Sequence, residues 1–150
     1  MRVALGSDHA GVVLKNELKR AFDKATPGDH PLHTCIDVGT YSEESVDYPE
    51  FAQQVAEGVA TNTFDRGILV CGSGIGISIA ANRYVQVRAA LVHDALGARM
   101  CRLHNDANVI CFGARMIGED VAKDCLDVFL NTEFEGGRHI TRVDKLASPN

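Results

Sequence analysis

Short apolar runs along the chain alternate with longer segments in which apolar residues recur every three or four positions. The short runs have the length and composition of strands buried within a sheet, because both of their faces are apolar. The longer segments have the periodicity of helices with one buried face. Strands are expected at residues 3–5, 35–38, 68–71, 88–93 and 109–112, and helices at 10–25, 75–81, 94–104 and 121–130, with a further helix behind Asp47.

This alternation of strands and helices predicts an α/β fold. We expect a three-layer, Rossmann-like, doubly wound sheet of about five parallel strands with helices on both faces. Residues 1–150 are expected to form a single domain, in which residues 136–150 are a C-terminal amphipathic segment. The prolines and the glycine between residues 26 and 33 predict a loop, and Asp47 with Glu50 predicts a capping box at a helix start.

Composition narrows the class of protein. A chain of 150 residues with 45% apolar residues is long enough for one full hydrophobic core. Its net charge of -5 argues against a protein that binds nucleic acid or anionic membranes. No apolar run approaches the roughly 20 residues needed to cross a bilayer, and no signal peptide is expected. The 5 cysteines lack Cys-x-x-Cys spacing and leave one unpaired, which favours reduced thiols and a cytoplasmic protein.

The most informative stretch is the junction at residues 67–76, where a predicted strand meets a predicted helix. Glycines stand at positions 72, 74 and 76, directly after Cys71. Glycines at such a junction allow a sharp turn whose N–H groups, together with the helix N-terminus, form a nest for an anion. A helix N-terminus also favours the thiolate form of a cysteine. We therefore expect an anion site beside a reactive Cys71.

Two common nucleotide-binding motifs do not fit this stretch. The dinucleotide fingerprint needs a third glycine where Ile77 stands, and it follows the first strand of a fold rather than the third. The sequence also has no Gly-x-x-x-x-Gly-Lys-Ser/Thr loop for a nucleoside triphosphate. His30 and His33 lie in the predicted loop without an obvious third ligand, so no metal site is expected.

Topology divides the candidate residues between two edges of the predicted sheet. Ligands of such folds bind beyond the carboxyl ends of the strands. The residues expected at that edge are Asp8, His9, Cys71 and Arg115. His104 ends a helix that spans roughly 16 Å and therefore belongs to the opposite edge. A two-fold dimer that places one subunit's helix end against the other's strand ends would join the two groups. We therefore expect a homodimer with shared active sites, with a dimer of dimers left open.

Several motifs follow one another along the chain: GSDHAG at 6–11, SVDYP at 45–49, CGSGIG at 71–76, RLHNDAN at 102–108 and EGGRH at 135–139. In this combination and order, the chain resembles ribose-5-phosphate isomerase type B, a family that also contains galactose-6-phosphate and allose-6-phosphate isomerases. The resemblance implies an enzyme of the pentose phosphate pathway that interconverts ribose 5-phosphate and ribulose 5-phosphate. The reaction would pass through an enediolate, without a metal or organic cofactor.

The resemblance also implies roles for individual residues. Cys71 would move a proton between C1 and C2 of the sugar, and His104 would open its furanose ring. The backbone N–H groups that would hold the developing oxyanion are those of Gly72, Ser73, Gly74, Ile75 and Gly76. The other substrate-binding residues would be Asp8, His9, Asn105, Arg115, Arg138 and Arg142, the last two on the phosphate. Asp47 would either contact the sugar hydroxyls or serve only as a helix cap.

Other functions compete with this interpretation. A hexose-6-phosphate isomerase that acts on allose or galactose phosphate would use the same motifs. A phosphosugar- or nucleotide-binding module without turnover would use the same anion nest. A thiol-based redox protein is disfavoured, because no resolving cysteine lies near Cys71 in the sequence.

Overall fold

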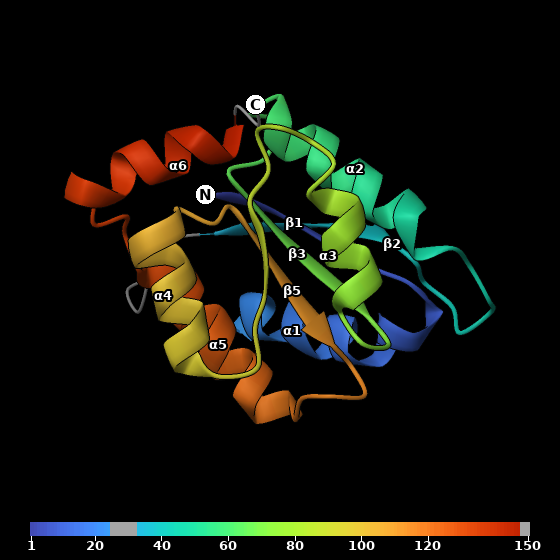
Figure 1. Ribbon diagram of the computed structural model, residues 1–150. Helices are drawn as coiled ribbons and strands as arrows, with labels where there is room; N and C mark the ends of the chain where they lie inside the picture. The colour runs from blue at the N-terminus through green and yellow to red at the C-terminus, as the bar shows by residue number, and fades with distance from the viewer. Residues whose placement is uncertain (25–32, 148–150) are drawn as a thin grey trace.

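The structure is a computed structural model that describes residues 1–24 and 33–147. Its centre is a 5-stranded, all-parallel sheet with the strand order β2-β1-β3-β5-β4 (Figure 1). The strands are β1 (Arg2–Ser7), β2 (Thr34–Gly39), β3 (Arg66–Cys71), β4 (Ala89–Leu91) and β5 (Val109–Gly113). The predicted parallel sheet is confirmed. The loop predicted at 26–33 falls almost entirely outside the described residues.

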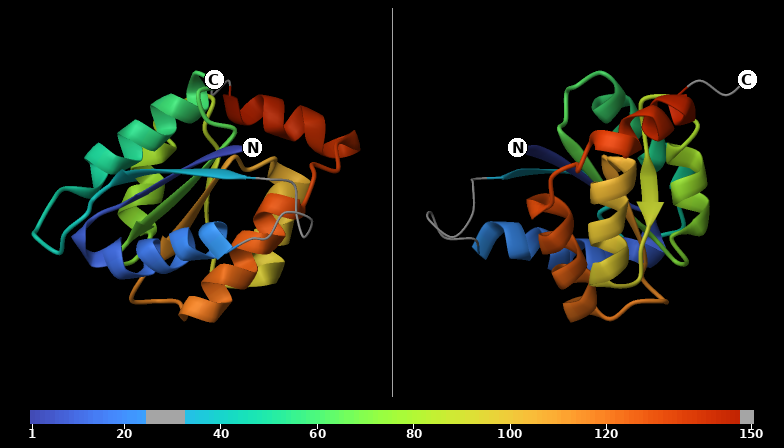
Figure 2. Two further views of the ribbon diagram at one scale, coloured as in Figure 1. Left: turned by 180° about the vertical axis from the view of Figure 1, so that it is seen from behind. Right: turned by 60° about the vertical axis from the view of Figure 1, so that its left-hand side comes forward.

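Helices cover both faces of the sheet, as the alternation predicts. They are α1 (Val12–Lys24), α2 (Tyr48–Ala60), α3 (Ile75–Ala81), α4 (Ala95–Asn105), α5 (Glu119–Asn131) and α6 (Ile140–Ala147), with the 3-10 turns η1 (His9–Gly11) and η2 (Gly137–His139). On one face lie α2 and α3, and on the other lie α1, α4 and α5 (Figure 1, Figure 2). Within the described part of the chain, none of these helices has both the length and the apolar character needed to cross a membrane.

Side chains along each strand alternate between two apolar cores, because successive residues of a strand point to opposite faces. In β3, Ile68 and Val70 are buried in the core formed with α1, α4 and α5. Leu69 and Cys71 belong to the core formed with α2 and α3. The last residue of β3, Cys71, is therefore placed on the same side of the sheet as α3, the helix that follows it.

The capping box expected at Asp47 is wrong. Asp47 occupies the N-cap position of α2, but its exposed side chain makes no capping hydrogen bond. The start of α1 also differs from the expected residue 10. The Asp8 carboxylate accepts a hydrogen bond from the Gly11 amide at 3.0 Å, which forms the turn η1 and delays α1 until Val12.

The fourth strand is shorter than the expected 88–93. The amide of Arg88 donates to the side-chain oxygen of Asn108 at 2.8 Å instead of to a neighbouring strand. After Leu91 the chain soon turns into α4, because the Asp94 carboxylate accepts a hydrogen bond from the Gly97 amide at 2.7 Å.

The C-terminal amphipathic segment forms α6, a helix in which no residue is buried. Ile140 is 49% exposed and Leu146 is 59% exposed. The helix lies near the C-terminal end of α4, at the edge of the sheet where β1, β3 and β5 begin (Figure 1). An apolar face of α6 therefore remains uncovered within one chain.

Candidate active site

A left-handed turn links β3 to α3 and shapes the predicted anion nest. Gly74, the N-cap of α3, has φ 76° and ψ -14°. A Cβ atom at this position would lie 2.4 Å from Leu91 Cδ1 and 2.8 Å from the carbonyl carbon of Phe112. Only glycine fits, because both the backbone conformation and the space exclude a side chain.

Cys71 lies directly under this turn and is 4% exposed. The amide of Gly74 donates a hydrogen bond to Cys71 Sγ at 3.1 Å. The amide of Ile75 donates to Ser73 Oγ at 3.3 Å. Two of the amides expected to face a ligand are thus used by the protein itself. Among the described residues, the amides of Gly72, Ser73 and Gly76 donate to no protein acceptor.

Two large side chains border the turn. An ideal Cβ atom on Gly72 would lie 3.5 Å from the guanidinium of Arg115, so that Arg115 rests against the nest as the topology predicts. An ideal Cβ atom on Gly76 would lie 2.9 Å from the hydroxyl of Tyr48. Sequence reasoning did not select Tyr48, although it belongs to the SVDYP motif that also contains Asp47.

The predicted pair Asp8 and His9 follows β1 at the same edge of the sheet. Asp8 is 6% exposed and caps η1 through one carboxylate oxygen. The amide of Val46 donates to His9 Nδ1 at 3.2 Å, which ties the histidine to the segment before α2. His9, Asp47 and the glycine turn therefore belong to one neighbourhood beyond the carboxyl ends of the strands.

His104 and Asn105 end α4 at the opposite edge. In the register of the sheet, Cys71 pairs with Gly113, the last residue of β5, whereas His104 precedes the first residue of β5. Figure 1 shows the end of α4 near α6 and away from the start of α3. Within one chain the structure does not bring His104 to Cys71, as the topology predicts.

His104 belongs to a cluster with two residues of the EGGRH motif. Its ring stacks on that of His139, with centroids 4.3 Å apart and an angle of 8° between the planes. Its Nε2 lies 3.8 Å from Glu135 Oε2, and the amide of Glu135 donates to the carbonyl of Leu103 at 3.1 Å. The motif was recognised in the sequence, but these two residues were not selected as part of the site.

The charge around this cluster is largely positive. Arg138 Nε lies 3.4 Å from His139 Nε2, and Arg142 Nη1 donates to the carbonyl of Arg138 at 3.3 Å. Burial lowers the pKa of His139, and the neighbouring charges of His104, Arg138 and Arg142 lower it further, against the opposing effect of Glu135. Two arginines four residues apart beside histidines fit a phosphate.

The same cluster is the one set of potential metal ligands found among the described residues. The ligand atoms of His104, Glu135 and His139 lie within 4.8 Å of one another. However, the guanidinium of Arg138 is directed at His139 and repels a cation at that position. The arrangement therefore favours an anion over a metal ion.

A comparison of the sequence with family models decides the family. The model described as ribose/galactose isomerase matches residues 3–146. This chain belongs to the ribose/galactose isomerase family. It is an enzyme, an aldose–ketose isomerase.

Relatives and solved structures agree with this assignment. The isomerase is 41% identical to ribose-5-phosphate isomerase B of Escherichia coli (strain K12) over 148 residues, which covers 98% of this chain and 95% of the relative. A structure of ribose-5-phosphate isomerase B from Clostridium thermocellum has a TM-score of 0.92 and 47% identity, with coverage of 98% and 95% of the two chains. The structure of the Mycoplasma genitalium enzyme with bound ribulose-5-phosphate has a TM-score of 0.89 and 36% identity, with coverage of 97% and 93%.

Proposed function

We propose that this isomerase interconverts ribose 5-phosphate and ribulose 5-phosphate, with Cys71 as the base. The observation that carries the proposal is the hydrogen bond from the Gly74 amide to Cys71 Sγ at 3.1 Å. This bond fixes the sulfur at the start of α3, beside the amides of the turn that have no protein acceptor among the described residues. Cys71 is therefore poised to accept a proton.

The proposed chemistry moves one proton from C2 to C1 of the substrate and a second from O2 to O1. The thiolate removes the proton from C2 of the open-chain aldose, and the electrons of that C–H bond form the enediolate with the negative charge on O1. After O1 is protonated, the thiol returns the proton to C1, and O2 loses its proton as the ketone forms. The substrate is neither oxidised nor reduced overall, so the reaction requires no redox cofactor.

The free amides of the glycine turn would stabilise the enediolate. Ser73 and Gly76 have N–H groups without an acceptor among the described residues. Oriented donors of this kind typically contribute about 3 kcal/mol each to the stability of a developing oxyanion. Asp8, His9, Asp47 and Arg115 would bind the sugar from the segments that surround the turn.

We further propose that His104 opens the furanose ring and that Arg138 and Arg142 bind the phosphate. These residues and Asn105 lie at the edge of the sheet opposite Cys71. A complete site would then combine the two edges from two chains in a homodimer, and pairing of two dimers would remain compatible with it. The uncovered apolar face of α6, with Ile140 and Leu146, supports such an interface.

The same proposal gives the protein a role in the pentose phosphate pathway of the cytoplasm. The cysteines support this location, because each of Cys35, Cys71, Cys101, Cys111 and Cys125 is a free thiol.

A direct assay tests the function. Equal concentrations of ribose 5-phosphate, allose 6-phosphate and galactose 6-phosphate are compared by kcat/KM, with ribose 5-phosphate expected to be the best substrate. A higher kcat/KM for either hexose phosphate would overturn the proposed substrate. If calorimetry detects binding of ribose 5-phosphate without any turnover, the chain is a binding module rather than an isomerase of this sugar.

A further inference from the structure

The C-terminal end of α4 has an unusual backbone, directly after two residues of the proposed site. Asp106 follows His104 and Asn105 and adopts the left-handed conformation, with φ 46° and ψ 43°. Glycine is the usual residue at such a position, because a Cβ atom disfavours the left-handed region. Asp tolerates this region better than most residues, and interactions of its side chain can stabilise the conformation further.

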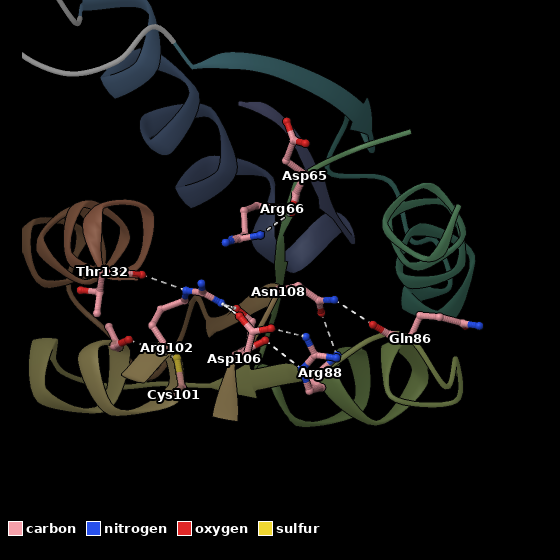
Figure 3. A network of polar contacts seen from close by, with 11 residues as sticks. Asp65, Arg66, Gln86, Arg88, Cys101, Arg102, Asp106, Asn108 and Thr132 are labelled. Carbon is pink, nitrogen blue, oxygen red and sulfur yellow. Dashed lines mark hydrogen bonds and ion pairs between the residues drawn. The ribbon is translucent and has the colours of Figure 1, made fainter. Parts of the chain in front are cut away.

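Two arginines hold the Asp106 carboxylate, one on each oxygen (Figure 3). Arg102 Nη1 donates to Oδ1 at 2.8 Å, and Arg88 Nη2 donates to Oδ2 at 2.8 Å. Arg88 Nε also donates to the main-chain oxygen of Asp106 at 2.8 Å. Arg88 therefore fixes both the side chain and the backbone of the left-handed residue.

Both arginines are themselves anchored. The side chain of Arg102 is 1% exposed, and it also donates to the carbonyls of Ala107 at 2.6 Å and Thr132 at 3.1 Å. The amide of Arg88 donates to Asn108 Oδ1 at 2.8 Å, and Asn108 Nδ2 donates to the carbonyl of Gln86 at 2.8 Å. Asp106 with Arg88 and Arg102, called the clamp below, thus joins the end of α4 to the end of α5 and to the starts of β4 and β5.

The cluster has an excess of positive charge. Arg66 extends from the start of β3 toward Arg102 (Figure 3), and burial together with the charge of Arg102 lowers the pKa of Arg66. Asp106 is the carboxylate that both Arg88 and Arg102 share. Its place between them is therefore favoured by charge as well as by hydrogen-bond geometry.

We propose that Arg88 and Arg102 are positioning residues for the reaction. By holding Asp106 in its left-handed conformation, they fix the last turn of α4 and with it the His104 imidazole and the Asn105 amide. This inference rests on the proposed function, in which His104 and Asn105 face the substrate. Arg88 and Arg102 themselves need not touch the sugar.

The test uses Arg88, because its side chain is 22% exposed and its loss leaves the pair of the buried Arg102 with Asp106 intact. The variants are Arg88→Gln, Arg88→Lys as the conservative replacement, and Arg99→Gln as a control on the exposed surface of α4. The measurements are kcat and KM for ribose 5-phosphate, the thermal midpoint, and the imidazole signals in a two-dimensional proton–carbon NMR spectrum.

We expect Arg88→Gln to fold and to lower kcat by roughly tenfold or more, because small displacements of catalytic groups have large effects on rate. The His104 ring signals should move, Arg88→Lys should restore part of the rate, and Arg99→Gln should resemble the wild type. If the His104 signals stay in place in folded Arg88→Gln, or if kcat stays within about twofold of wild type, the clamp does not position the site.

A second variant keeps the test decisive if Arg88→Gln does not fold. Asp106→Asn retains a residue type that tolerates the left-handed region but weakens both charge-assisted hydrogen bonds. It should shift the His104 signals and lower kcat, and unchanged signals would overturn the inference. Wild-type activity of His104→Gln would instead contradict the proposed function, because that variant leaves the clamp intact.

Discussion

The amide of Gly74 and the sulfur of Cys71 are joined by a hydrogen bond of 3.1 Å that closes the turn between β3 and α3. Gly74 is left-handed, and its conformation completes the same turn at the point where α3 begins. The same turn leaves the amides of Ser73 and Gly76 without a protein acceptor among the described residues. One local conformation thus orients the proposed base and the proposed oxyanion donors together.

Cys71→Ala should remove turnover and leave substrate binding largely intact. Loss of a general base typically lowers kcat by about 10² to 10⁴-fold. Steady-state kinetics measures the rate, and calorimetry with ribose 5-phosphate measures the affinity. Cys35→Ala serves as the control, because Cys35 lies in β2 and burial raises the pKa of its thiol to about 11. Isomerisation that persists in Cys71→Ala would remove Cys71 from its proposed role.

Mixed dimers should reveal whether the two edges of the sheet form one site. Homodimers of Cys71→Ala and of His104→Ala should both be inactive. Random pairing of the two variants puts about half of the dimers in the mixed form, each with one intact site, so that about a quarter of the wild-type rate should return. Verified mixed dimers without any recovery would contradict a shared site.

Gly74→Ala should be strongly destabilising. The new Cβ would lie 2.4 Å from Leu91 Cδ1 and 2.9 Å from the amide nitrogen of Gly113, and φ is +76°. Left-handed strain alone costs about 1–3 kcal/mol, and the steric conflict adds to it. Gly118→Ala is the matched control, because a Cβ there has nothing within 4 Å. Urea unfolding should show a large loss for the first variant and almost none for the second.

Lys15→Met should lower the free energy of unfolding by about 3 kcal/mol or more, because it removes the cation that pairs with the largely buried carboxylate of Asp37. The ammonium of Lys15 lies 2.6 Å from the carboxylate of Asp37, and the two side chains are 0% and 12% exposed. Lys19→Met on the same helix breaks a pair with Asp23 that is 38% and 62% exposed. Urea titration should show a loss below about 1 kcal/mol for that variant. Equal losses of unfolding free energy in the two variants would mean that burial of the pair of Lys15 and Asp37 does not increase its contribution to stability.

Stability should fall as the pH is lowered below neutrality, in part through His139. Its pKa in the folded protein lies below its ordinary value of 6.5, chiefly because the ring is buried. Between these two values the unfolded chain binds more protons than the folded one, so the free energy of unfolding decreases as the pH falls. Thermal midpoints at pH 7.5 and 5.5 measure the effect. The decrease should be smaller in His139→Gln than in the wild type, and an equal decrease in both would contradict the contribution of His139.

The alternation of strands and helices could be predicted from the sequence because apolar periodicity is a local property. The placement of Cys71 and His104 at opposite edges could also be predicted. A helix that connects parallel strands must run back against them, so its last residue lies where the strands begin. The capping box predicted from Asp47 and Glu50 does not form. The sequence pattern specifies only residue types, whereas a capping hydrogen bond also depends on the orientation of the side chain.

The sequence by itself determined which segments are buried and that the glycine turn follows a cysteine. Only the tertiary structure decided that β5 lies between β3 and β4, that the Gly74 amide binds the Cys71 sulfur, and that Arg88 reaches Asp106. The physical reason lies in how far apart the partners are along the chain. Arg88 and Asp106 come into contact only when β4, α4 and β5 have packed together. The apolar periodicity of these elements contains no information about that contact.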